Sequence, residues 1–210
     1  MKRFDRSARR LLAASLAVVV IAFLLTAMLA RADRFASLDR DTRSFVRDGR
    51  SRALTTPMRA VSFLGSGYVL LPATFAVSVV LWRRRDRSLA QSLPAIGIGA
   101  AAVLEIIKRI VDKPRPSLRG YGFPSGHVFG VTVFVVGAVY LLWLFEAPRR
   151  VQRAARVIGA AFVLAVGYSR LYLNAHWPSD VGGGLLAGGA FALVMVLVVD
   201  ARLAEPGRLR

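Results

Sequence analysis

Residues 11–30 have the sequence LLAASLAVVVIAFLLTAMLA, which contains no charged residue. About 20 apolar residues in a helix cross the roughly 30 Å hydrocarbon layer of a bilayer. Five more long apolar stretches follow, at residues 61–82, 89–111, 128–145, 157–173 and 181–199. The sequence therefore predicts an all-α fold, an integral membrane bundle of six transmembrane helices that forms a single membrane domain over residues 1–210.

The composition supports this class. Hydrophobic residues make up 55% of the chain and the mean hydropathy is +0.50, whereas a soluble domain is about 45–50% apolar. The absence of cysteine excludes disulfides and thiolate chemistry. The net charge of +18 comes from arginines in the short gaps between apolar stretches, a pattern typical of membrane topology signals and contacts with anionic headgroups. We therefore expect the lipid bilayer, and no nucleic acid, as a partner.

The first apolar stretch also fits a signal peptide, because Ala30-Arg31-Ala32 resembles a small-residue cleavage site. The apolar region of a secretory signal is usually about 7–15 residues long, shorter than this stretch. We therefore expect the stretch to remain in the protein as a membrane anchor.

A polar, arginine-rich segment at residues 31–60 separates the first two stretches. Within this segment, apolar positions recur at helical spacing, at Phe35, Leu38, Thr42, Phe45 and Val46. One such stripe among Arg and Asp residues is typical of a helix that lies in the membrane interface. A solvated loop with an incidental stripe is the alternative.

Clusters of basic residues predict the orientation, since cytoplasmic loops carry an excess of Lys and Arg. A cytoplasmic N-terminus also places in the cytoplasm the basic residues at 83–87, at 149–156 and at Arg202, Arg208 and Arg210. Residues 31–59 hold eight arginines yet fall outside, where four aspartates dilute their charge. The sequence thus predicts a multi-pass cell-membrane protein with cytoplasmic N- and C-termini. Residues 108–127 and 169–180 then lie at the extracytoplasmic ends of their helices.

Both histidines of the chain, His127 and His176, lie in these outer segments together with Lys108, Arg115 and Arg170. Cations so placed can clamp an anion, and arginine can bind phosphate oxygens in a bidentate manner. Two histidines and an aspartate could instead hold zinc. Three fixed cations would repel a metal ion and stabilise an oxyanion, so we expect neither a metal nor a cofactor.

Two local patterns bear on the chemistry. Ser125 and Gly126 precede the stretch at 128–145, where Ser125 is expected to cap the helix and Gly126 to let the backbone approach a ligand. His176 and Asp180 are four residues apart, so one helical turn would bring them together. Asp180 would then accept a hydrogen bond from one ring nitrogen of His176 and leave the other nitrogen free to attack.

Three motifs in this order resemble the type 2 phosphatidic acid phosphatase (PAP2) family, whose site also occurs in vanadium haloperoxidases. They are Lys-x6-Arg-Pro at residues 108–116, Pro-Ser-Gly-His at 124–127 and Ser-Arg-x5-His-x3-Asp at 169–180. The motif region covers residues 108–180, and no defining position is missing. The resemblance implies an all-α bundle with the site at the ends of its core helices.

The resemblance also implies a role for each site residue. His176 would attack phosphorus to give a phosphohistidine, Asp180 would orient it, and His127 would protonate the leaving oxygen and then activate water. The implied phosphate-binding residues are Lys108, Arg115, Ser125, Gly126 and Arg170.

The function predicted on this basis is hydrolysis of a lipid phosphate monoester or pyrophosphate at the extracytoplasmic face. The substrates that the family suggests are phosphatidic acid, phosphatidylglycerol phosphate and polyprenyl pyrophosphate or phosphate. A phosphatase of soluble phosphomonoesters and a non-catalytic membrane protein that binds anionic lipid are the alternatives. A haloperoxidase, being soluble, fits poorly with six apolar stretches. The oligomeric state stays open.

Overall fold

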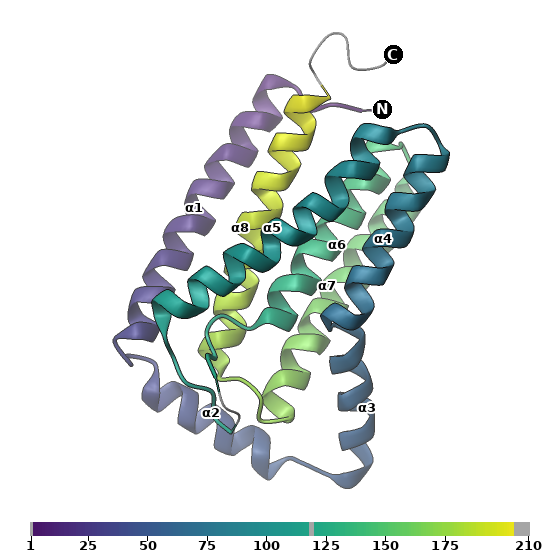
Figure 1. Ribbon diagram of the computed structural model, residues 1–210. Helices are drawn as coiled ribbons and strands as arrows, with labels where there is room; N and C mark the ends of the chain where they lie inside the picture. The colour runs from purple at the N-terminus through teal and green to yellow at the C-terminus, as the bar shows by residue number, and fades with distance from the viewer. Residues whose placement is uncertain (1, 118–119, 204–210) are drawn as a thin grey trace.

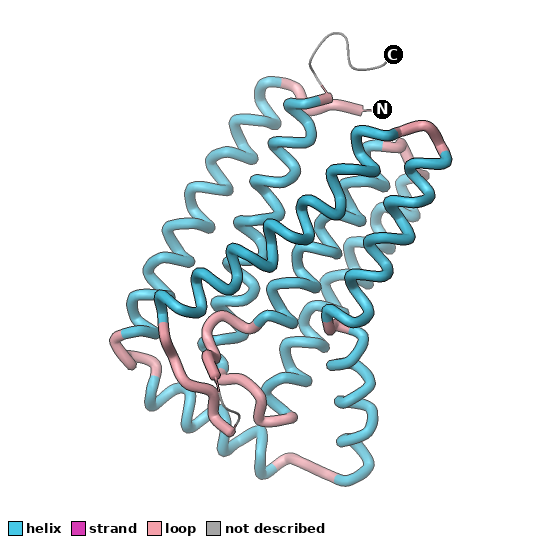
Figure 2. The backbone as a smooth tube through the Cα atoms, in the orientation of Figure 1, coloured by secondary structure: helices cyan, strands magenta, loops and turns pink. Residues whose placement is uncertain are grey.

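A computed structural model describes residues 2–117 and 120–203, and helices account for most of this part of the chain (Figures 1 and 2). The helices are α1 (Arg6–Arg31), α2 (Ala36–Asp48), α3 (Arg52–Leu64), α4 (Gly67–Arg83), α5 (Arg87–Val111), α6 (Gly126–Leu144), α7 (Arg149–Tyr172) and α8 (Pro178–Arg202). Within the described residues no strand forms, and one isolated bridge joins Pro114 to Tyr121. The predicted all-α fold is confirmed.

Five of the described helices, α1 and α5 to α8, are long and apolar enough to cross a membrane. Helices α3 and α4 together are long and apolar enough for a sixth span, but the chain bends by 41° between them. The span predicted at residues 61–82 therefore corresponds to the end of α3, the bend and most of α4. Gly65 and Ser66 separate the two helices, and a β-carbon at Gly65 would lie 2.7 Å from the methyl groups of Val166 on α7. Close contact with α7 thus accompanies the break.

The other spans run beyond the apolar stretches that predicted them. Helix α7 begins at Arg149, so the basic residues at 149–156 are helical and do not form a loop as expected. Helices α1 and α8 likewise extend into charged flanks. An apolar stretch marks where a helix meets lipid, while long basic side chains let the same helix continue into the interface. Each of these helices therefore begins earlier in the sequence than its apolar stretch does.

The polar segment at residues 31–60 contains α2 and most of α3, which excludes the solvated-loop alternative. Helix α2 lies across the end of the bundle and packs against α7 and α8 (Figure 1). The predicted stripe does not form one face of α2. Val46 is buried against the bundle together with Asp39, whereas Leu38 and Phe45 are exposed. An exposed apolar face at this position suits a helix in the membrane interface.

Helix α8 packs between α1 and α6, and α6 also packs on α7 and α4. Glycines make the contact between α8 and α6 close. A β-carbon at Gly184 would lie 2.7 Å from the carbonyl oxygen of Ser125, and one at Gly188 would lie 2.8 Å from that of Phe129. Small residues allow helix backbones to approach in this way within a membrane. The contact fixes the start of α6 against the first turns of α8.

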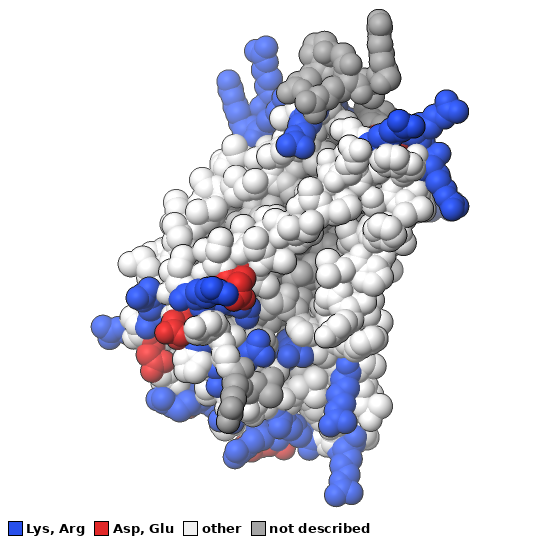
Figure 3. Space-filling model, in the orientation of Figure 1, with Lys and Arg blue, Asp and Glu red and all other residues white. Residues whose placement is uncertain are grey.

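Charge is segregated along the bundle. Lys and Arg side chains gather at its two ends in Figure 3, and the face between them in this view is uncharged. At the end where α1 begins, the fully buried Asp200 of α8 forms an ion pair with Arg9 at 2.8 Å and accepts the backbone N–H of Phe4 at 3.2 Å. Arg208 and Arg210, which contributed to the predicted orientation, lie outside the described residues. An uncharged belt between two basic ends is the surface expected of a multi-pass membrane protein.

Candidate active site

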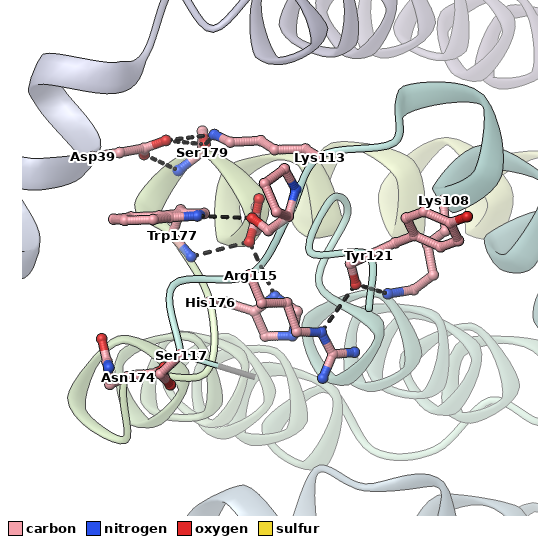
Figure 4. Close-up of polar contacts among 12 residues, drawn as sticks. Asp39, Lys108, Lys113, Arg115, Ser117, Tyr121, Asn174, His176, Trp177 and Ser179 are labelled. Atoms are coloured by element: carbon pink, nitrogen blue, oxygen red, sulfur yellow. Dashed lines mark hydrogen bonds and ion pairs between the residues drawn. The ribbon is translucent and has the colours of Figure 1, made fainter. Parts of the chain in front are cut away.

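The three predicted motifs meet at the end of the bundle opposite the start of α1 (Figure 1). The end of α5 and the following loop bring the first motif, the start of α6 brings the second, and the end of α7 with the loop before α8 brings the third. Figure 4 shows side chains of the loop after α5 and of the loop before α8 turned toward one another. Residues separated by more than 60 positions in the sequence thus share one site.

His176 and Asp180 are in contact, although not in the way the spacing predicted. His176 lies in the loop before α8, while Asp180 belongs to the first turn of that helix. The Asp180 carboxylate lies 3.2 Å from Nδ1 of His176 and accepts the backbone N–H of Trp177 at 3.0 Å. The expectation that one helical turn joins His176 to Asp180 is wrong, because Pro178 begins the helix. A capping carboxylate reaches back to the histidine instead.

The protonation state of His176 follows from these contacts. An ionised carboxylate only accepts hydrogen bonds, so Nδ1 of a neutral His176 ring carries the proton and Nε2 keeps its lone pair. Burial lowers the pKa of His176 below its usual range, the hydrogen bond to Asp180 opposes this, and the charges of Arg170 and Arg115 add to the lowering. Near neutral pH the ring is therefore unprotonated at Nε2.

Lys108 and Arg115 converge on one backbone carbonyl. Nζ of Lys108 donates to the carbonyl oxygen of Tyr121 at 3.3 Å, and Nε of Arg115 donates to the same oxygen at 2.9 Å (Figure 4). Lys108 is buried although it stands at the end of α5. The chain folds back after α5 so that Arg115 returns toward Lys108.

Arg170 supplies the third cation from the last turn of α7. Its side chain is 9% exposed, and one guanidinium nitrogen donates to the hydroxyl of Ser62 on α3. Nε of Arg170 is buried and has no hydrogen-bond partner among residues 2–117 and 120–203. A buried, unsatisfied donor on a charged group is costly unless a ligand completes it.

Ser125 occupies the N-cap position of α6, but the expected cap is absent because its side chain makes no capping hydrogen bond. The Ser125 hydroxyl is fully buried and lacks a partner within the described part of the chain. The backbone N–H of Ser125 instead donates to the carbonyl oxygen of Asp180 at 2.9 Å. Gly126 follows, and an added β-carbon there would lie 3.1 Å from Leu104. The hydroxyl and the helix start are therefore available to an anion.

His127 is half-buried in the first turn of α6. It interacts electrostatically with His176 and with Arg170, Arg115 and Lys108. His127 also lines a cavity of about 540 Å³, between α3 and the starts of α4 and α6. The second histidine therefore faces open space, whereas His176 is buried beside its carboxylate.

No group of three or more His, Cys, Asp or Glu residues that could hold a metal occurs among the described residues. Apart from the Asp180 carboxylate beside His176, the charged groups of the site are the cations Lys108, Arg115 and Arg170. Such a set stabilises the charge of an oxyanion directly. Phosphate is the ligand that this chemistry fits.

Sequence reasoning missed a buried ionic cluster beside the site. Nζ of Lys113 donates to Oδ2 of Asp39 at 2.5 Å and to Oγ of Ser179 at 2.6 Å. Ser179 donates to Asp39 from its backbone N–H at 2.9 Å and from its hydroxyl at 2.7 Å (Figure 4). The cluster joins α2, the loop that carries Arg115 and the start of α8. Asp39 is one of three aspartates in α2, with Asp41 and Asp48, and nothing in the local sequence sets it apart from the other two.

A second set of missed contacts holds the two loops together. Nε1 of Trp177 donates to the carbonyl oxygen of Pro114 at 3.0 Å, and the hydroxyl of Ser117 donates to the backbone carbonyl oxygen of Asn174 at 2.5 Å. Asn174 adopts a left-handed conformation with φ +56°, and its side chain accepts from Arg43 of α2 at 2.7 Å. These contacts fix the Arg115 loop against the His176 loop.

The fold and the site together define a class of protein. It is a multi-pass membrane protein with two histidines, a carboxylate and three convergent cations at one end of the bundle. Residues 73–204 match the family model of the PAP2 superfamily. The match covers more than half of the 210 residues and contains all three motifs, so the chain belongs to the PAP2 superfamily.

The chain is also similar to individual proteins and to a solved structure. The chain is 29% identical over 130 residues to an undecaprenyl-diphosphatase of Sulfolobus acidocaldarius, covering 62% of this chain and 54% of the relative. It is 31% identical over 157 residues to an uncharacterized 22.5 kDa protein in the cps region of Klebsiella pneumoniae, covering 70% of each. The chain thus spans about half the length of the first relative. The crystal structure of a PAP2-type phosphatidylglycerolphosphate phosphatase from Bacillus subtilis has the same fold, with a TM-score of 0.82, 19% identity and coverage of 92% of this chain and 98% of that one.

Proposed function

We propose that this protein is a metal-independent phosphatase that hydrolyses a lipid phosphate monoester or pyrophosphate through a phosphohistidine intermediate. The observation that carries the proposal is the contact between Nδ1 of His176 and Asp180, beside the unpartnered Nε of Arg170 and hydroxyl of Ser125. The imidazole of His176 is oriented for attack, while Nε of Arg170 and the hydroxyl of Ser125 can donate hydrogen bonds to phosphate oxygens. Binding alone would need only the cations.

In the first step Nε2 of His176 attacks phosphorus, and the bond from phosphorus to the leaving oxygen breaks. The electron pair of that bond goes to the leaving oxygen, and His127 supplies the proton. Lys108, Arg115 and Arg170 stabilise the charge on the transferring phosphoryl oxygens, which is the main contribution a protein makes to phosphoryl transfer. Ser125 and the backbone at Gly126 donate to the same oxygens.

In the second step water attacks the phosphohistidine, and His127 now accepts a proton from that water. The bond between phosphorus and Nε2 breaks, its electron pair returns to the imidazole, and inorganic phosphate leaves. The same group serves as acid and then as base because the first step leaves it deprotonated. Its place beside a cavity supports this role, since a leaving group and then water can reach it.

A second, apolar cavity supports a lipid substrate. It measures about 250 Å³ and lies between α4, α5 and α6. Its lining runs from Gly126 and Leu104, next to the site, to Leu141 and Met195 further along the bundle. A cavity of this character would hold an acyl or prenyl tail while the phosphate lies among the cations. The names of the Sulfolobus and Bacillus proteins, which include a lipid diphosphate and a lipid phosphate monoester, support the same class of substrate.

The positive-inside rule supports an extracytoplasmic site with both termini in the cytoplasm. Under this orientation the substrate would reach the site from the outer leaflet. Labelling of single introduced cysteines, one near Arg85 and one near Asn174, with an impermeant reagent tests the topology in a chain that has no other cysteine.

The purified protein, assayed in mixed micelles with a panel of lipid phosphates and with p-nitrophenyl phosphate, tests the function. Phosphate release should persist in EDTA and be inhibited by vanadate. Because the bond between phosphorus and a histidine nitrogen is labile in acid, a radiolabelled substrate followed by rapid quenching at alkaline pH should reveal labelled protein. His127→Ala should accumulate this label with p-nitrophenyl phosphate, whose leaving group needs no proton, and His176→Ala should show none.

Other results would contradict particular parts of the proposed function. Normal phosphate release by His176→Ala would remove the nucleophile assignment. Turnover of soluble monoesters without any lipid phosphate would replace the lipid assignment, and binding of anionic lipid without turnover would leave a non-catalytic protein.

A further inference from the structure

The cavity beside His127 has polar groups in its lining that the proposed transfer of one phosphate does not use. We call it the His127 cavity, and its polar and aromatic lining comes from Arg59, Ser62, Phe63, Ser66, Tyr68 and His127. Its volume is about 540 Å³. None of the described residues that line it is acidic. The wall is therefore suited to an anion.

Two donors in this wall lack partners. Ser66 is 6% exposed, and its buried hydroxyl makes no hydrogen bond within the described residues. Arg59 is exposed at the mouth of the cavity and forms no hydrogen bond or ion pair in the part of the chain that the structure describes. A buried hydroxyl without a partner is rare in a folded protein and points to a ligand. Arg59 supplies a fixed positive charge next to it.

The geometry of α3 directs these groups to one place. Arg59 and Ser62 are three residues apart and lie on one face of the helix, and Ser66 follows at the break before α4. Ser62 holds Arg170, which is one of the three cations of the site. The same helix face therefore supports the transferring phosphate at Ser62 and faces the neighbouring cavity at Arg59 and Ser66.

We infer that the His127 cavity binds a second phosphate group, one that belongs to the leaving group of the substrate. This inference rests on the proposed function, in which His127 protonates the leaving oxygen and so must lie beside the leaving group. When the terminal phosphorus moves to Nε2 of His176, the departing oxygen and the phosphate attached to it lie next to His127. Arg59 and Ser66 donate to that phosphate, which stabilises the charge that develops on it.

The path of the lipid tail agrees with this placement. Gly67 and Leu71 line both the His127 cavity and the apolar cavity. A substrate can therefore place its second phosphate beside Arg59 and its tail between α4, α5 and α6. Two kinds of lipid carry such a phosphate, a prenyl diphosphate, in which it is joined directly to the first, and phosphatidylglycerol phosphate, in which a glycerol separates the two.

The test compares substrates that differ by one phosphate. The kcat/KM of the full-length protein is measured for farnesyl diphosphate against farnesyl monophosphate, and for phosphatidylglycerol phosphate against phosphatidic acid. A charge-assisted hydrogen bond at a partly exposed arginine corresponds to about a tenfold effect. Arg59→Gln should therefore lower the ratio within at least one pair about tenfold, and Ser66→Ala should lower the same ratio. Arg52→Gln, which removes a charge from the same helix outside the cavity, should leave both ratios unchanged.

Which pair responds identifies the source of the second phosphate. Unchanged ratios in both pairs for Arg59→Gln, with phosphate still released from all four lipids, would overturn the inference and leave the proposed function intact. Absence of release from every lipid by the unaltered protein would instead remove the proposed function itself. Equal losses for both members of each pair would also overturn the inference, since they would show a general role for Arg59.

Discussion

Replacing Asp39 with asparagine should destabilise the protein because it leaves a buried lysine without its counter-charge. The side chains of Asp39 and Lys113 are 3% and 7% exposed, and their charged atoms lie 2.5 Å apart. Removal of one member of a buried ion pair costs about 3–5 kcal/mol. The asparagine side chain keeps an oxygen for the N–H of Ser179, so about 3 kcal/mol is the expected loss. For a chain of this length the loss corresponds to a fall in Tm of about 6–12 °C.

Thermal unfolding in detergent micelles, followed by tryptophan fluorescence, measures this effect. Asp41→Asn is the matched control, because Asp41 is an exposed carboxylate on the same helix. The double variant Asp39→Asn with Lys113→Met removes both charges and should recover much of the lost stability. A single variant as stable as the control, or a double variant no better than Asp39→Asn alone, would refute the reasoning.

Three further outcomes are expected. The acid limb of kcat/KM should lie below pH 6.5, the usual pKa of histidine, because attack needs a neutral ring and the pKa of His176 is lowered. Asp180→Asn removes the carboxylate that raises this pKa. The pH profile of this variant, measured with the same substrate, should therefore move to still lower pH, and its maximum rate should fall. Gly184→Ala should lower the free energy of unfolding by about 1–3 kcal/mol through overpacking, because the new β-carbon would lie 2.7 Å from the backbone carbonyl oxygen of Ser125. Gly182→Ala is the control and should be neutral in the same thermal assay, since its β-carbon would meet nothing within 4 Å in the described chain. Ala101→Trp should fill the apolar cavity and raise KM for a long-chain lipid phosphate more than for a short-chain one, and equal KM values would contradict the placement of the tail.

The long helices could be predicted because a bilayer imposes one length on every span. Residues 11–30 and 181–199 fall inside α1 and α8 for that reason. The break between α3 and α4 could not be predicted, since Gly65 and Ser66 lie within a stretch that is apolar overall. What accompanies the break is Val166 on α7, about one hundred residues further along the chain. A contact of this kind is visible only after the helices have packed.

The sequence indicated which residues form the candidate site, but it did not indicate which residues hold them in place. Motif spacing indicated that His176, Asp180 and the three cations belong together, and the structure brings them to one end of the bundle. Nothing local distinguished Lys113 from the neighbouring Arg115, although Lys113 is buried against Asp39, 74 residues earlier in the chain. The unfulfilled cap at Ser125 was equally hidden, because the same residue type is the usual choice for capping.

Asp180 lies in the first turn of α8 and also contacts His176, the nucleophile of the proposed mechanism, and this double contact has a consequence for biogenesis. The carboxylate oxygen that lies 3.2 Å from Nδ1 of His176 also accepts the backbone N–H of Trp177 at the start of the helix, so the same folded turn supports both contacts. A chain inserted in the membrane with α8 out of register would lack an aligned nucleophile. Incompletely assembled copies would therefore be inert toward the surrounding lipids, so the onset of hydrolysis would report that the last helix has docked.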